Sequence, residues 1–222
     1  MNAFVLATAI AALVGGAVAV SAREPRIAAL GLAVALTASA IVVDPPPGMA
    51  AFAFRVVAGI LAAFLARLAS RRATATVGSP LGIPATVVGG LAVFVLGLGT
   101  SSLVLHLGGP PAAGGAGLGL LALAAAPVAI GRDAFRVGTG LLVAATGVFL
   151  VRVSFGGTPA DLEFAVEGLV LAILAAIVVV LTVAAAAATE GVAIPAGEDP
   201  RRGALRLAHR LTDPVRHSRL GR

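Results

Sequence analysis

Four ionisable residues lie inside stretches of the chain that are otherwise apolar: Arg55, His106, Arg152 and Glu167. Ionisable side chains are expensive in a lipid bilayer, so residues of this kind mark ion or proton pathways, or contacts with a charged partner helix. The structural alternative is an Arg–Glu pair together with arginines whose long side chains reach the lipid head groups. The residues leave both interpretations open, and we favour the structural one.

Arg152 and Glu167 are expected to pair. A short turn joins the two stretches that hold them, so these stretches should pack as an antiparallel hairpin with both side chains at similar depth. Arg55 has no acidic residue in its own stretch, and its partner should be Glu167 or a group on a neighbouring subunit. No acidic residue lies near the middle of any apolar stretch, which argues against a proton pump or antiporter that acts alone.

Seven apolar stretches carry these residues, and most are about 17–25 residues long, enough for a helix to cross a bilayer. Only 12% of the residues are charged, 59% are hydrophobic, and the mean hydropathy is +1.05, whereas a soluble domain is about 25% charged. The composition therefore predicts an all-α polytopic membrane helix bundle of about seven transmembrane helices. The stretches cover residues 3–20, 27–43, 49–68, 83–106, 116–131, 137–154 and 164–188.

The arginines predict the orientation of this bundle. They occur in alternate gaps, at Arg23 and Arg26, at Arg71 and Arg72, and at Arg132 and Arg136, with seven more in the C-terminal segment. The other gaps, at 44–48, 107–115 and 155–163, contain none. By the positive-inside rule the N-terminus is outside and the C-terminus is cytoplasmic. The expected location is the inner (plasma) membrane, with multiple passes.

Residues 1–188 are expected to form one transmembrane helical domain, and residues 189–222 a basic cytoplasmic tail. In the tail, leucines alternate with arginines in a short amphipathic pattern that favours contact with the cytoplasmic leaflet or a soluble subunit; a disordered tail is the alternative. The net charge of +6 sits in the tail and at helix ends, which indicates anionic lipid and not nucleic acid as its partner. The candidate contact residues are Arg201, Arg202, Arg206 and Arg210.

The residue types also narrow the chemistry. The chain has no cysteine and three histidines, and it shows no Ser–His–Asp grouping, phosphate loop or metal-ligand spacing. We therefore expect no catalytic site, metal or cofactor of its own. The longest inner gap, residues 70–82, divides the chain into three helices followed by four. The sequence shows no clear internal repeat across that gap, although such an arrangement could hide an old duplication.

Two segments carry a resemblance to a known family, namely residues 54–61, with Arg55 early in the third helix, and residues 140–181, a glycine-containing helix, a short turn and an apolar helix that opens with an acidic residue. In these features the chain resembles the E component of hydrogenase-4 and formate hydrogenlyase membrane arms. That component is related to the K subunit of NADH–quinone oxidoreductase and the C subunit of multisubunit cation/proton antiporters.

The resemblance implies an accessory membrane subunit of an ion-translocating redox or antiporter-like complex, bound to neighbouring membrane subunits. One departure matters: K-type subunits place relay glutamates within their helices, whereas residues 142–147 here contain no carboxylate. The subunit is then expected to act as a structural spacer. The alternatives are a small stand-alone transporter and a membrane scaffold protein.

Overall fold

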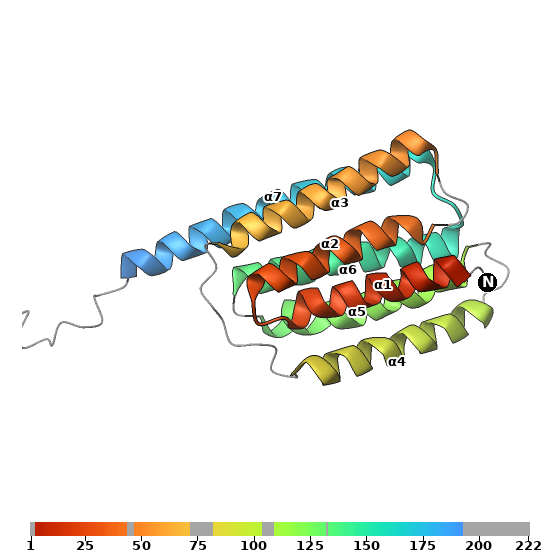
Figure 1. Cartoon of the computed structure of the whole chain (residues 1–222), viewed down its shortest axis with the longest axis horizontal. Helices are drawn as coiled ribbons and strands as arrows, with labels where there is room; N and C mark the ends of the chain where they lie inside the picture. The colour runs from red at the N-terminus through yellow and green to blue at the C-terminus, as the bar shows by residue number, and fades with distance from the viewer. Residues whose placement is uncertain (1–2, 44–46, 72–81, 104–108, 132, 193–222) are drawn as a thin grey trace, which may run out of the picture. The chain divides into compact units, whose positions relative to one another are not determined.

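The computed structural model describes residues 3–43, 47–71, 82–103, 109–131 and 133–192, and these residues form seven helices and no strand. The expected all-α class is therefore confirmed for this part of the chain (Figure 1). The helices are α1 (Ala3–Ser21), α2 (Pro25–Ile41), α3 (Met49–Ser70), α4 (Gly82–Leu103), α5 (Pro111–Ile130), α6 (Ala134–Gly156) and α7 (Asp161–Val192).

Five of these helices, α1, α3, α5, α6 and α7, are long and apolar enough to cross a membrane. Helix α2 has 17 residues, about 25 Å at 1.5 Å per residue, slightly less than a hydrocarbon core of about 30 Å. The described apolar part of α4, Val87–Gly99, is shorter still. A helical membrane protein is thus indicated, while the count of seven crossings and their direction stay predictions.

Helix α5 begins earlier than its sequence suggested. Residues 107–115 were expected to be a loop, but α5 begins at Pro111, with Pro110 as its N-cap. Proline is favoured at the first position of a helix, and the glycines that follow serve packing. A Cβ atom on Gly115 would lie 3.0 Å from the Phe94 carbonyl oxygen of α4. Glycine at this position therefore lets α4 and α5 approach closely, and the expected loop is wrong in its second half.

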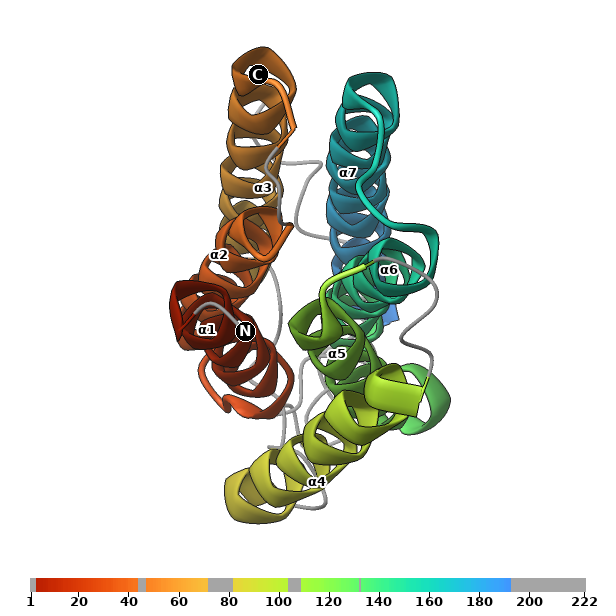
Figure 2. The ribbon, with the colours of Figure 1, turned by 90° about the vertical axis from the view of Figure 1, so that its right-hand side faces the viewer.

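Within residues 1–186, which form one compact unit, the helices form two rows of three. Helices α1, α2 and α3 make the first row, and α5, α6 and α7 make the second (Figure 2). Helix α1 packs against α5, α2 against α6, and α3 against α7, and the members of each pair run in the same direction. Helix α4 packs against α5 and α1.

The two rows have the same helix order and direction, which is the form of an internal repeat that a three-plus-four arrangement could hide in the sequence. Once the rows are known, the sequence also shows it. Residues 31–37 read GLAVALT and residues 140–146 read GLLVAAT, with five identical positions. Both segments begin six residues after the first residue of their helix, Pro25 in α2 and Ala134 in α6. The match is short and its residues are common in apolar helices, so the sequence alone does not distinguish it from a chance similarity.

The repeated segments have opposite burial in the two rows. Leu32 is fully buried whereas its counterpart Leu141 is 39% exposed, and Val34 is 47% exposed whereas Val143 is buried. Helices α2 and α6 therefore meet through opposite faces of the same pattern. It follows that the second row is shifted relative to the first and is not rotated about an axis between them.

Glycines hold the helices of each row close together. A Cβ atom on Gly31 would lie 2.7 Å from the Gly15 carbonyl oxygen, and one on Gly15 would lie 2.7 Å from the Gly31 carbonyl oxygen. Gly117 and Gly147 make the same reciprocal approach between α5 and α6. Small residues at such crossings allow close van der Waals packing, which drives helix association in membranes.

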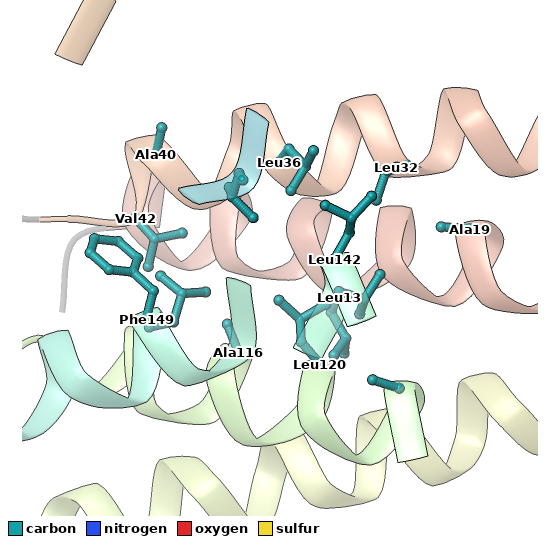
Figure 3. Packing of buried hydrophobic residues seen from close by; sticks show 14 of the residues in the cluster. Leu13, Ala19, Leu32, Leu36, Ala40, Val42, Ala116, Leu120, Leu142 and Phe149 are labelled. Carbon is teal, nitrogen blue, oxygen red and sulfur yellow. The ribbon is translucent and has the colours of Figure 1, made fainter. Parts of the chain in front are cut away.

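Leucines and alanines fill the space between the two rows. Phe149 lies at one end of this cluster, beside Val42 (Figure 3). The side chains labelled in the interior come from both rows, so the cluster joins the two halves of the repeat. They include Leu13, Leu32, Leu36, Ala116, Leu120 and Leu142.

Candidate functional site: a buried charge pair between two helices

Arg55 is the largest fully buried side chain among the described residues, at 0% exposure. It lies on α3, six residues after Met49, or about 9 Å along the helix axis. Its guanidinium carbon lies 5.6 Å from the centre of the Phe149 ring of α6, within reach of a cation–π attraction. Gly168 of α7 packs on Arg55, because a Cβ atom there would lie 3.3 Å from the Arg55 Cα.

Glu167 of α7 is the partner of Arg55. Its Oε2 forms an ion pair with the Arg55 Nε, and the Glu167 side chain is 15% exposed. The separation of these atoms makes an ion pair, but neither atom takes part in a hydrogen bond of normal geometry, so the attraction is chiefly Coulombic. Glu167 is one of the two partners that the sequence left open for Arg55.

The pairing leaves part of the guanidinium unsatisfied. The Arg55 Nη1 and Nη2 atoms are buried and have no hydrogen-bond partner within the residues that the structure describes. A buried polar atom without a partner costs about 1–3 kcal/mol, and the Phe149 ring offsets only part of that cost. The Coulombic attraction to Glu167 is therefore essential to keep Arg55 in this position.

A second ion pair lies one helical turn closer to the start of α7. The Arg152 Nη2 of α6 is 2.5 Å from the Glu163 Oε2, and the two side chains are 43% and 38% exposed. The expected pairing of Arg152 with Glu167 is therefore wrong. Its physical reason is depth, since Glu163 is nearer than Glu167 to the turn that joins α6 and α7, and so lies opposite Arg152.

Three acidic residues in the first two turns of α7, Asp161, Glu163 and Glu167, form a series of charges, here called the charge column, that leads inward from the start of the helix. The Asp161 Oδ1 accepts a hydrogen bond of 2.7 Å from the Gly48 N–H at the N-cap of α3. Glu163 follows, and Glu167 lies four residues further on, on the same helix face. Each carboxylate contacts a different group, so α7 is tied by charge to both α3 and α6.

The predicted site residues are only partly brought together. Arg55 and Glu167 form the buried pair, and Arg152 forms the outer pair with Glu163. Glu163 was not among the site residues predicted from the sequence. The signal for Glu163 was its spacing of four residues from Glu167, which places two carboxylates on one face. His106, Arg201, Arg202, Arg206 and Arg210 lie outside the described residues.

The described residues contain no group of three or more His, Cys, Asp or Glu side chains that could hold a metal ion. The chemistry that they offer is a charge column with one buried cation at its inner end. No protein-family model, curated protein or solved structure matches this chain.

Proposed function

We propose that this protein is an accessory integral-membrane subunit of an ion-translocating redox or antiporter-like complex. It binds neighbouring membrane subunits, carries no cofactor or catalytic site of its own, and lies in the inner membrane with its N-terminus outside. The complex is of the type that the sequence resembles, the membrane arm of hydrogenase-4 or of NADH–quinone oxidoreductase.

The buried Arg55–Glu167 pair carries this proposal. An intramembrane ion pair is expensive and is retained where a charge is needed for function or for register between elements. The pair connects α3 to α7, one helix from each row, and it lies near one end of both helices. A site near one end supports an inserted or supporting subunit better than a carrier with a central binding site, because carriers bind substrate near the midplane.

The outward surfaces of α3 and α7 are compatible with a partner as well as with lipid. Both helices expose a series of large apolar side chains at helical spacing. Those on α3 are Phe54, Val57, Ile60, Leu61, Phe64 and Leu68, and those on α7 include Val166, Leu169, Val170, Ile173, Ile177 and Val180.

Co-purification tests the proposal. The protein would be tagged, extracted from its own membranes in mild detergent without crosslinker, and its partners identified by mass spectrometry. The expected result is recovery of large antiporter-like membrane subunits in fixed stoichiometry. Recovery of the protein alone, from membranes in which such subunits are present, would contradict it.

The internal repeat favours a second candidate, a small stand-alone transporter. Parallel structural repeats occur in secondary transporters, where the site lies between the repeats. Here the interface between the rows is filled by leucines and alanines in the described residues. The purified protein, reconstituted alone into proteoliposomes with an internal pH indicator, would distinguish the candidates. Proton movement across the membrane favours the transporter, and an unchanged internal pH under an imposed gradient favours the subunit.

A further inference from the structure

Two arginines lie close together at the end of α3. Arg67 and Arg71 are four residues apart, and Arg71, the C-cap residue, keeps helical backbone angles (φ −70°, ψ −22°), so the two side chains are neighbours on one face of the helix. Both residues are exposed. Neither guanidinium forms an ion pair or a hydrogen bond with another residue that the structure describes. The end of α3 therefore presents two free cations side by side.

The groups nearest to these arginines in the chain do not use their donors. The Ser70 hydroxyl donates a hydrogen bond of 2.6 Å to the Arg67 carbonyl oxygen, and the Arg71 N–H donates one of 3.2 Å to the Leu68 carbonyl oxygen. Glu24, the N-cap residue of the neighbouring helix α2, is exposed and forms no ion pair with either arginine. Both guanidinium groups are therefore free to bind an anion.

Helix α3 meets its two neighbours through its opposite side. A Cβ atom on Gly59 would lie 3.3 Å from the Leu36 Cβ of α2, and one on Gly168 of α7 would lie 3.3 Å from the Ala58 Cβ. Figure 2 shows α3 at the edge of its row, beside α2 and α7. By helical spacing, the face that carries the two arginines is turned away from Ala58 and Gly59. This face therefore lies on the surface of the bundle.

An exposed apolar strip leads along this face from the arginines toward the middle of α3. Val57, Ile60, Phe64 and Leu68 are all exposed, and their spacing of three or four residues places them in one line. Val57 lies ten residues before Arg67, or about 15 Å along the helix. That length is about the depth of one leaflet, half of a hydrocarbon core of about 30 Å. Because α3 is a candidate membrane span, the strip matches an acyl chain whose head group lies at the arginines.

A phospholipid supplies both groups that this face can bind. The planar guanidinium presents several N–H donors in a fixed fork that fits a phosphate group, and it stays charged at all physiological pH values. The acyl chain below the phosphate covers exposed apolar side chains over the same depth. A free phosphate ion or an acidic segment outside the membrane would contact the arginines and leave the strip uncovered.

We propose that the outward face of α3, from Val57 to Arg71, binds one anionic phospholipid. Arg67 and Arg71 hold its phosphate group, and one acyl chain lies along the strip of Val57, Ile60 and Phe64. Basic residues beside a membrane helix attract anionic lipids in this way. The proposal is independent of the charge column and of the role in a larger complex.

Native mass spectrometry of the delipidated protein, titrated with phosphatidylglycerol or with phosphatidylcholine of the same acyl chains, tests the arginines. The wild type should retain phosphatidylglycerol in preference to phosphatidylcholine. The double variant Arg67→Gln/Arg71→Gln should bind phosphatidylglycerol about tenfold or more weakly, since each basic residue near a membrane surface contributes severalfold to the affinity. The matched control is Arg23→Gln/Arg26→Gln, which removes two exposed arginines beside the start of α2 and should bind nearly as the wild type does.

Two phenylalanines of α3 test the apolar strip without a change of charge. Phe64→Ala should weaken the binding of phosphatidylglycerol about threefold or more, because it removes apolar surface that the acyl chain covers. Phe54→Ala is the control, because Phe54 is also exposed but lies 13 residues before Arg67, about 20 Å away and beyond the depth of one leaflet. These single variants keep both arginines, so they test the site even if the double arginine variant does not fold.

Equal binding of phosphatidylglycerol by the wild type and Arg67→Gln/Arg71→Gln would overturn the proposal. An equal loss in Arg23→Gln/Arg26→Gln would also overturn it, because binding would then follow only the total charge, and so would an equal loss in Phe54→Ala and Phe64→Ala. Displacement of the lipid by equimolar inorganic phosphate would assign the arginines to a free anion. Unchanged lipid binding with loss of co-purifying membrane subunits in the double variant would assign them to a protein partner.

Discussion

Arg55 of α3 and Glu167 of α7 lie at the same distance from the starts of their helices and face one another between the two rows. Each lies six residues after the first residue of its helix, Met49 in α3 and Asp161 in α7. The two helices are parallel neighbours, so the two residues have similar depth, and the ion pair between them links the two rows at that depth.

The two residues of this pair should be energetically coupled. Arg55→Met and Glu167→Met should each lower the free energy of unfolding by about 1–3 kcal/mol, because each leaves a buried partner uncompensated. The double variant should be less destabilised than the sum of the two, because apolar replacement of a whole buried pair is often tolerated. Unfolding in mixed micelles measures this, and additive losses would show that the residues do not interact.

The outer ion pair, between Arg152 and Glu163, should contribute much less to the free energy of unfolding than the buried pair. Arg152 and Glu163 are each about two-fifths exposed, and ion pairs in such positions contribute about 0–1 kcal/mol. Glu163→Gln should therefore change the free energy of unfolding by less than Glu167→Gln, although the two glutamates are one turn apart on the same helix. The same micelle titration compares the two variants directly, and a larger effect at Glu163 would assign the critical role to the outer pair.

Gly31 should not tolerate a methyl group. A Cβ atom there would lie 2.6 Å from the Ala19 backbone nitrogen and 2.7 Å from the Gly15 carbonyl oxygen, so Gly31→Ala should cost about 1–3 kcal/mol through overpacking. The control is Gly89→Ala in α4, whose Cβ would meet nothing within 4 Å and which should gain up to about 1 kcal/mol in helix propensity. Thermal unfolding of both variants measures the difference, and equal melting temperatures would refute the close crossing.

In the proposed ion-translocating complex, Arg55→Ala should reduce the amount of this protein and leave ion translocation per assembled complex unaltered. The reason is that none of the seven described helices has an acidic residue near its middle for Arg55 to regulate. Immunoblotting of membranes and a translocation assay on purified complex separate the two quantities. Normal abundance with lost translocation would instead assign Arg55 a role in coupling.

Reporter fusions should show the predicted topology. Fusions at Arg72, at Arg132 and in the tail should report the cytoplasm, and fusions at Pro46, Pro111 and Gly157 the outside, because the arginine-rich connections remain inside. Helix α2 is the shortest of the seven described helices. Fusions in the first connections are therefore the most informative, because they test whether this short helix crosses the membrane. An inverted result at one inner site would change the number of crossings.

The helices were largely predictable from the sequence, whereas their partners were not. Hydropathy located all seven helices, because membrane helices need long apolar stretches. The start of α5 was missed because Gly114 and Gly115 resemble a loop until α4 is placed against them. The Arg152–Glu167 pairing was inferred from one hairpin alone, and it failed because Glu167 contacts α3, a helix more than a hundred residues earlier in the chain.

The shift between the two rows has a consequence for assembly. A two-fold rotation would place α1 beside α7 and would close after two copies, whereas a shift places α1 beside α5 and does not close. When one row is shifted onto the other, the outer face of the first row corresponds to the inner face of the second, and the outer face of the second corresponds to the inner face of the first. Each outer face thus matches a face that the other row already uses for packing. A third row, supplied by another polypeptide and displaced in the same direction, would extend the stack with the same kind of contact, so the fold is open to growth on two sides.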